Sequence, residues 1–438
     1  MIFIGFQPNA CKKDLGIALS FLLLPWKWVS LRKGIAIQKA EEWLKNFFDS
    51  KYCVTFDSGR TALQKGLEAF GISKGDEVLV QGYTCVVVVN AIKWAGGSPV
   101  YVDITRDLIM DPQDLEHKIT DKSKVLIIQH TFGKSADLEK LLAVTKKYNL
   151  KVIEDCAHTI GGNYYGKKLG TFGDIGMFSF GSDKVVSSVR GGALICNDEF
   201  LGNKIQALQS KLPLSTRTKI LQYLINIPVF MLLKPLYQYG IGKWILAVCK
   251  KLNITGRIMY EKEKRGEQVS FYPSKFPNAL AELLVFQLED LDEMNAHRKE
   301  LGDIYMHGIE HKKILPILDS DTIPLRFNVL VEDPKKLQKI AQESGIVLGN
   351  WYDDVITPCS IGIEGMGYKS GECRTAEKYS KMSVNLPTNR NISTKDVLKI
   401  IELINNFTEE KGDTRVFPLS SVREGRGESC GHRTQGGE

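Results

Sequence analysis

The sequence predicts an α/β protein built around a mainly parallel sheet. Short apolar runs rich in β-branched residues alternate along the chain with amphipathic stretches of roughly ten residues. This alternation is typical of strand–helix–strand crossovers. Polar and Gly-rich segments follow several of the apolar runs, and the ends of parallel strands gather such segments at one edge of a sheet.

The N-terminal half is expected to supply most of this sheet. Apolar residues at helical spacing predict a helix over 34–48, and a strand follows over 52–56. The segment DSGRTALQKGLEAFGI then opens a helix at Ser58–Gly59, whose free N–H groups and dipole can bind a phosphate. The other expected elements are a strand–turn–helix–strand unit over 75–104, a helix over 111–119, strands over 124–129, 152–155 and 175–180, a strand starting at 191–192, and a helix over 199–212.

Two apolar segments stand outside this alternation. Residues 15–29 are interrupted at Pro25, and residues 214–268 are interrupted at Pro228 and Pro235. Neither segment reaches the roughly 18 apolar residues that a membrane-spanning helix requires. We expect burial, a dimer contact, or a peripheral membrane contact in which the basic flanks of 214–268 meet anionic lipid.

The C-terminal part predicts a long helix over 272–300 and then a smaller α/β domain over 301–410. Strands are expected at 325–331 and 346–348, and helices at 334–344 and 396–407. The large domain would cover 1–300, including both apolar segments. Residues 411–438 are rich in Gly, Arg and Ser and predict a disordered tail.

The charge and the cysteine content of the chain make some classes of binding partner unexpected. The net charge is +7 and the basic residues are scattered, so a nucleic-acid-binding stripe is not expected. An anionic substrate or an anionic membrane surface suits this charge. The nine cysteines contain no CxxC pair, which favours a reducing cytoplasm and predicts neither a disulfide framework nor a metal site.

Several candidate functional residues lie in one stretch, residues 152–198, with the sequence VIEDCAHTIGGNYYGKKLGTFGDIGMFSFGSDKVVSSVRGGALICND. Asp155, His158, Ser179 and Lys184 follow its strand-like runs, where an α/β sheet binds ligands. These are the groups that pyridoxal 5′-phosphate (PLP) requires: an amine for the Schiff base, a carboxylate for the pyridine nitrogen, an imidazole near the 3′ oxygen and a hydroxyl for the phosphate. The alternative is a set of ordinary sheet turns with an incidental lysine.

The ordered set resembles the DegT/DnrJ/EryC1/StrS family of sugar aminotransferases, whose pattern runs roughly viEDaAh…GtfGdigvfSFh.tKn…geGG.v.tnd. The resemblance extends over most of 35–407. The family's SGTaAL motif corresponds to Ser58–Gly59, and Arg60 stands where the family usually has threonine. This arginine can bind the phosphate or point elsewhere. Cys85 follows Thr84 where the family often has an aromatic residue stacked on the cofactor.

The resemblance implies fold type I, with a large sheet domain and a smaller C-terminal α/β domain. Lys184, Asp155 and His158 would be catalytic. The cofactor would be held by Ser58, Gly59, Arg60, Cys85, Asp155, His158, Ser179 and Lys184. It also implies a homodimer, in which Lys275 or Asn278 replaces an asparagine that the family contributes from the partner subunit.

The resemblance further implies a transfer of an amino group from glutamate to a nucleotide-linked keto-sugar, in polysaccharide or related glycan biosynthesis. Lys184 argues against the branch of relatives that carry histidine there and act as dehydratases. Two alternatives stay open. One is another PLP reaction, or a membrane-associated aminotransferase acting on a lipid-linked sugar at the inner membrane face. The other is a regulator or scaffold with this fold and no turnover.

Overall fold

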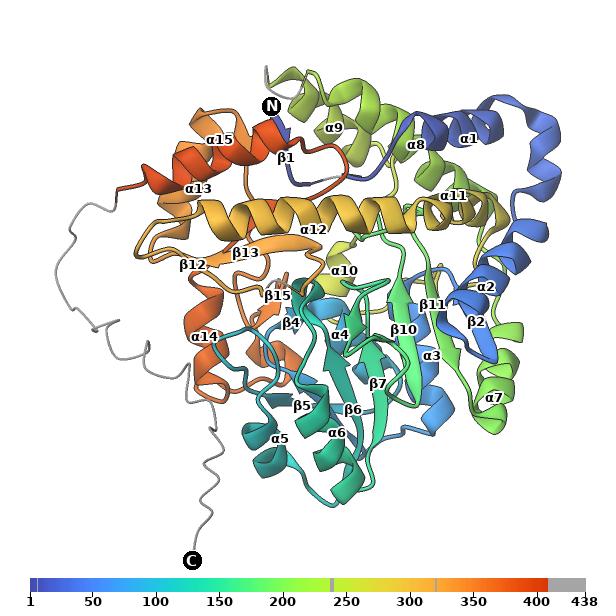
Figure 1. Cartoon of the computed structure of the whole chain (residues 1–438). Coiled ribbons are helices and arrows are strands. Elements are labelled where there is room, and N and C mark those ends of the chain that lie inside the picture. The colour runs from blue at the N-terminus through green and yellow to red at the C-terminus, as the bar shows by residue number, and fades with distance from the viewer. Residues whose placement is uncertain (6, 237–239, 320, 409–438) are drawn as a thin grey trace, which may run out of the picture. The chain divides into compact units, whose positions relative to one another are not determined.

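A seven-stranded sheet forms the centre of the unit that residues 1–406 make (Figure 1). The computed structural model describes residues 1–5, 7–236, 240–319 and 321–408. The strand order is β2-β11-β10-β7-β6-β3-β5; neighbours from β10 to β5 run parallel, and β11 pairs antiparallel with β10 and β2. The strands are β2 Tyr52–Phe56, β3 Glu77–Gln81, β5 Ser98–Val102, β6 Ser123–Gln129, β7 Lys151–Asp155, β10 Ile175–Ser179 and β11 Gly192–Cys196. The predicted α/β class and mainly parallel sheet are confirmed.

Both faces of this sheet are buried. Along β6, Val125 and Ile127 belong to one apolar cluster, whereas Leu126 and Ile128 belong to the other. This alternation is why the strands read as continuous apolar runs in the sequence. The helices of this half are α2 Ile35–Phe48, α3 Gly59–Phe70, α4 Val86–Trp94, α5 Pro112–Lys118, α6 Leu138–Lys147 and α7 Glu199–Ser210.

The two apolar segments of the sequence pack against each other. The first forms α1 Lys12–Leu23 and a 3₁₀ turn at Pro25–Ser30; the second forms α8 Arg217–Leu233, α9 Ile241–Lys251 and α10 Glu261–Lys264. Helices α1 and α8 lie side by side (Figure 1), and Phe21 and Leu224 share one core cluster. Within the described residues, we find no helix that combines the length and the apolarity needed to cross a bilayer.

The expectation that Pro228 interrupts its segment is wrong, because α8 continues through this proline to Leu233. A proline inside a helix costs about 3 kcal/mol. Burial of Ile220, Leu224 and Ile227 on the inner face of α8 offsets this cost, since each large apolar side chain contributes roughly 1.5–3 kcal/mol.

The long helix expected over 272–300 is instead two helices, α11 Asn278–Glu289 and α12 Leu291–Gly308. The break falls at Asp290, which leaves helical geometry and accepts a hydrogen bond from Arg390 at 3.3 Å. Helix α11 packs on α2 beside the sheet.

The remaining elements follow α12 in the chain. A three-stranded antiparallel sheet contains β12 Leu315–Pro316, β13 Arg326–Leu330 and β16 Ser383–Pro387. The helices are α13 Pro334–Glu343, α14 Arg374–Ser380 and α15 Thr394–Asn405. Short strands tie this part to the first half: β1 Ile2–Phe3 pairs with β14 Ile346–Val347, and β4 Thr84–Cys85 pairs with β15 Ile356–Thr357. The boundary at residue 300 stays a prediction, and the expected tail at 411–438 lies outside the described residues.

Candidate active site

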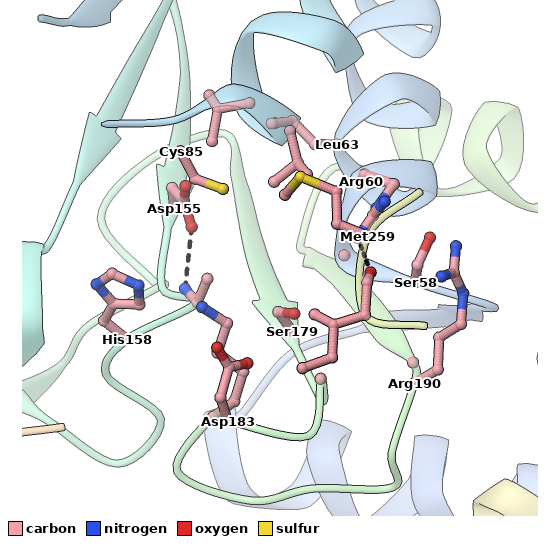
Figure 2. Close-up of a pocket in the computed structure, with 18 of the residues that line it drawn as sticks. Ser58, Arg60, Leu63, Cys85, Asp155, His158, Ser179, Asp183, Arg190 and Met259 are labelled. Atoms are coloured by element: carbon pink, nitrogen blue, oxygen red, sulfur yellow. Dashed lines mark hydrogen bonds between the residues drawn. The ribbon is translucent and has the colours of Figure 1, made fainter. Parts of the chain in front are cut away.

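The carboxyl ends of β7 and β10 border a cavity of about 300 Å³ (Figure 2). Asp155 is the last residue of β7 and Ser179 the last residue of β10, and the parallel pairing of these strands brings both ends to the same edge of the sheet. The cavity is lined by every residue that the sequence predicts to hold the cofactor, namely Ser58, Gly59, Arg60, Cys85, Asp155, His158, Ser179 and Lys184. These residues come from four separate parts of the chain.

Asp155 is a buried carboxylate, with only 4% of its surface exposed. One of its oxygens accepts a hydrogen bond from the Ala157 N–H at 3.0 Å (Figure 2). Burial raises the pKa of Asp155 above its usual value, while the Ala157 N–H and the charge of Lys184 act to lower it. A cationic hydrogen-bond donor in the cavity would stabilise the ionised form. The protonated pyridine nitrogen of PLP is such a donor, so Asp155 fits this group.

His158 is fixed as a neutral imidazole. Its Nδ1 accepts a hydrogen bond from the Phe132 N–H at 3.2 Å, so the ring proton is on Nε2, which lies 3.4 Å from the Tyr352 hydroxyl. Burial lowers the pKa of His158 well below its ordinary value, and the charges of Lys184 and Arg326 act in the same direction. The Phe132 ring stacks on the imidazole with an interplanar angle of 9°. A neutral, immobilised donor therefore lines the cavity.

Lys184 lies in the loop that follows β10. Its Nζ is 5.0 Å from the centre of the Trp351 ring. The buried side chain of Asn9 donates to the carbonyl oxygens of Lys184 and Val185 at 2.6 and 2.8 Å, and Arg298 holds Asn9 by a bond of 3.0 Å. The N-terminal segment thus anchors the backbone that carries the lysine. Sequence reasoning missed Asn9, because its contact spans 175 positions of the chain.

A cradle for an anion lies where α3 begins. Ser58 is the N-cap of α3 and accepts a hydrogen bond from the Thr61 N–H at 3.3 Å. A Cβ added at Gly59 would lie 2.8 Å from the Ser179 Cβ, so only glycine lets this helix end approach β10 so closely. Free N–H groups at a helix N-terminus and two hydroxyls suit a phosphate.

Two arginines border this cradle, and they differ in what they contact. Arg60 donates to the Ile258 carbonyl at 3.0 Å and forms an ion pair with Glu263. Arg190 is 5% exposed and lies beside Ser58 (Figure 2). Its Cζ atom is 4.6 Å from the centre of the Tyr272 ring. Its Nε and Nη2 have no hydrogen-bond partner among the described residues. These buried, unsatisfied cationic donors fit the phosphate group of PLP.

Sequence reasoning also missed Arg190. The signal was present, since this arginine precedes the glycine pair 191–192, where the family pattern has glutamate. Arg60, the residue that the sequence singled out, has its guanidinium engaged by Ile258 and Glu263, and its contact with phosphate stays a prediction.

The other predicted residues are placed as follows. Cys85 is the N-cap of α4, and burial raises the pKa of its thiol, so it offers a neutral, soft surface to the cavity. The Asn278 side chain forms hydrogen bonds within its own chain. It accepts from the Ala36 N–H at 2.9 Å and donates to the Ser30 carbonyl at 2.9 Å. Of the two residues expected to serve a partner subunit, Lys275 is the one without such side-chain bonds among the described residues.

His130 follows β6 directly and does not line the cavity. It is buried, with its Nε2 at 3.2 Å from Glu154. Glu154 in turn accepts hydrogen bonds from the backbone N–H groups of Gly170, Phe172 and Gly173. This pair holds the loop between β7 and β10 in place and has a structural role.

Comparison with known proteins agrees with this geometry. The model of the DegT/DnrJ/EryC1/StrS aminotransferase family matches residues 23–219 and 245–405. GDP-perosamine synthase of Escherichia coli O157:H7 is 29% identical over 390 residues, which cover 88% of this chain and 93% of that protein. A dTDP-3-amino-3,6-dideoxy-alpha-D-galactopyranose transaminase of Aneurinibacillus thermoaerophilus is 27% identical, covering 85% of this chain and 90% of its own.

Solved structures show the same fold. The PLP form of a putative sugar aminotransferase, Spr1654 of Streptococcus pneumoniae, aligns with a TM-score of 0.70 at 20% identity, covering 92% of this chain and 97% of that one. Helicobacter pylori PseC, an aminotransferase, aligns with a TM-score of 0.71 at 19% identity, covering 92% and 98%. Since the family model matches well over half of the sequence, this chain belongs to the DegT/DnrJ/EryC1/StrS aminotransferase family and is a PLP-dependent transaminase of fold type I.

Proposed function

We propose that the protein transfers an amino group from glutamate to the keto group of a nucleotide-linked sugar. The observation that carries this proposal is the meeting of Lys184, Asp155 and His158 in one cavity beside an anion-binding helix end. The relatives named GDP-perosamine synthase and dTDP-3-amino-3,6-dideoxy-alpha-D-galactopyranose transaminase support a nucleotide-sugar acceptor. A relative of 27% identity, the spore coat polysaccharide biosynthesis protein SpsC of Bacillus subtilis, supports a glycan pathway.

Bound PLP supplies an aldehyde that condenses with amines and a ring that withdraws electrons from the carbon bearing the amine. Lys184 provides the amine that holds the cofactor, and its Nζ afterwards carries protons at the reacting carbon as a general base and acid. Asp155 presents its carboxylate to the pyridine nitrogen. His158, neutral and stacked on Phe132, would donate from Nε2 to the cofactor's oxygen and so orient its ring.

The anchor for the phosphate is the Ser58–Gly59 helix end, with the Ser179 hydroxyl on the facing strand. Arg190 adds a permanent positive charge to this cradle, and two of its nitrogens have no hydrogen-bond partner in the part of the chain that the structure describes. Trp351 and Tyr352 also line the cavity, and the Trp351 ring lies next to the Lys184 amine.

The proposal includes a homodimer in the cytoplasm, in which Lys275 of one subunit serves the cavity of the other. A membrane-associated variant of the same reaction, on a lipid-linked sugar, is the second candidate. Exposed apolar side chains on both apolar segments favour it: Trp26 is 71% exposed, Leu232 73% and Trp244 69%. Such side chains suit an interface between protein and lipid.

The test is a two-stage assay of the purified, PLP-loaded enzyme. Glutamate alone should change the visible absorbance of the bound cofactor and release 2-oxoglutarate. Addition of GDP- or dTDP-linked keto-sugars should then yield an amino-sugar detectable by mass spectrometry. If glutamate produces no change and no keto-sugar is aminated, the protein is a scaffold or regulator and the proposal fails. Amination by a different amino acid would refute only the glutamate assignment.

A further inference from the structure

The loop that carries Lys184 receives two hydrogen bonds from a buried asparagine near the N-terminus. Asn9 is 0% exposed, and its Nδ2 donates to the carbonyl oxygens of Lys184 and Val185 at 2.6 and 2.8 Å. No other donor among the described residues reaches either carbonyl. Buried carbonyls without a partner are costly, so the position of this loop depends on the Asn9 amide.

The orientation of the Asn9 amide is fixed by Arg298. This arginine is 1% exposed and donates from Nη2 to Asn9 Oδ1 at 3.0 Å. A guanidinium has donors and no acceptor, so the amide oxygen must face Arg298 and the NH2 group must face the two carbonyls. Arg298 is held in turn, because its Nη1 donates to the Leu325 carbonyl at 3.0 Å and to the Thr388 hydroxyl at 3.2 Å. A charged donor on one side of an amide also strengthens the bonds that the amide donates on the other.

Gln287 holds the next part of the same loop. Its Oε1 accepts from the Ser187 N–H at 3.2 Å. Its Nε2 donates to the Asn9 carbonyl at 3.3 Å and to the Asp14 carboxylate at 2.9 Å. Gln287 lies on α11 and Asp14 on α1, both side chains are buried, and these two helices contact each other. Asn9 and Gln287 therefore attach the lysine loop to helices that pack outside the central sheet.

The side chains next to these bonds set the direction in which Lys184 leaves the backbone. Val185 is 2% exposed and belongs to a core cluster, whereas Lys184 lines the cofactor cavity. A lysine carries its amine on a flexible four-carbon chain, so the amine reaches one place reliably only if its backbone is fixed. Displacement of a reacting group by about 1 Å can slow a reaction about a hundredfold.

We propose that Asn9 is a positioning residue, which places the Lys184 amine where it reacts with the aldehyde of PLP. This inference rests on the proposed role of Lys184. In that reaction the neutral Nζ attacks the aldehyde carbon, a C=N bond replaces the C=O bond, and the oxygen leaves as water with the two hydrogens of the amine. Asn9 does not line the cavity that contains Ser58 and Arg190. Its loss should therefore weaken Schiff-base formation and leave the contacts with the phosphate intact.

The test compares two ligands that differ only at the reacting carbon. Apoprotein is titrated calorimetrically with PLP and with pyridoxine 5′-phosphate, which has an alcohol in place of the aldehyde and cannot react with lysine. The wild type should bind PLP more tightly. Asn9→Leu is similar in size but removes both donors. It should raise the Kd for PLP about thirtyfold, as loss of two hydrogen bonds of ordinary strength does, and leave the Kd for pyridoxine 5′-phosphate unchanged.

Two further variants separate the Asn9 donors from the fold. Asn9→Asp keeps an acceptor for Arg298 but turns an oxygen toward the two carbonyls, so it should weaken PLP at least as much as Asn9→Leu. Asn389→Leu is the matched control, because Asn389 is another buried asparagine that holds the N-terminal segment, donating to the Phe3 carbonyl at 3.4 Å. Asn389 forms no hydrogen bond with Lys184 within the described part of the chain. This control should leave the ratio of the two Kd values unchanged.

A loss confined to PLP in the Asn9 variants supports the inference, and Asn9→Asp decides alone if Asn9→Leu does not fold. The inference is overturned if the two ligands weaken alike, if neither changes, or if Asn389→Leu alters the ratio as much. If the wild type binds PLP no more tightly than pyridoxine 5′-phosphate, Lys184 does not react with the cofactor and the proposed function fails. A preference of the wild type for PLP that the Asn9 variants retain overturns only this inference.

Discussion

Replacement of Arg190 by glutamine tests the phosphate cradle. The side chain is buried, and two of its nitrogens, Nε and Nη2, have no partner among the described residues. Each hydrogen bond to a charged group is worth about 1.5–3 kcal/mol. Loss of two such bonds at the low end of that range amounts to about 3 kcal/mol, which raises the Kd for PLP about 150-fold.

The assay compares two ligands that differ only in the phosphate. Apoprotein is titrated with PLP and with pyridoxal, and binding is followed by absorbance. Arg190→Gln should weaken PLP about 150-fold, whereas pyridoxal, which has no phosphate, should bind both proteins alike. General damage to the cavity would weaken PLP and pyridoxal alike. The ratio of the two changes in affinity therefore isolates the contribution of the phosphate contact.

Arg60→Gln is the matched control, because this second arginine lines the same cavity but is engaged by Ile258 and Glu263. We expect it to lower thermal stability and to affect PLP and pyridoxal equally. If Arg190→Gln changes PLP affinity less than about threefold, below the contribution of a single such bond, Arg190 does not hold the phosphate.

Three further changes test other parts of the site. Asp155→Asn should leave PLP bound but lower kcat on the order of a hundredfold or more, as loss of a fixed electrostatic partner does; an unchanged kcat would contradict the role of the carboxylate. His158 has a pKa well below its ordinary value, so the unfolded chain takes up a proton that the folded chain does not. The free energy of unfolding of the apoprotein should therefore fall as the pH drops below about 6.5, and less steeply in His158→Phe; equal slopes in urea titrations would contradict this. Gly59→Ala should cost about 1–3 kcal/mol of stability, because its Cβ meets Ser179, whereas Gly16→Ala, which points into open space, should cost nothing; equal unfolding midpoints would refute the close approach.

The elements of the central sheet could be predicted because their signals are local. Strand β2 begins and ends where its apolar run does, and Ser58 caps α3 as its side chain and position indicate. The residues that line the cavity could be predicted from the sequence for a related reason. Parallel strands bring their carboxyl ends to one edge, so Asp155 and Ser179 meet there whatever the loops between them do.

The features that could not be predicted depend on contacts between residues far apart in the sequence. Nothing local indicates that Asn9 holds the Lys184 loop or that α1 packs on α8, since each contact joins segments about two hundred residues apart. Pro228 has the local signature of a helix break, but packing of α8 against the core overrides it. Arg190 directly precedes the glycine pair 191–192, but its proposed role depends on the three-dimensional structure, which places two of its nitrogens beside Ser58 without partners among the described residues.

Borohydride reduction of the PLP-loaded enzyme, followed by peptide mapping, tests the central claim most directly. The cofactor should become covalently attached to the peptide that contains Lys184, and Lys184→Ala should lose both this adduct and turnover. Attachment at another lysine, or full turnover by Lys184→Ala, would contradict the assignment of the reacting amine.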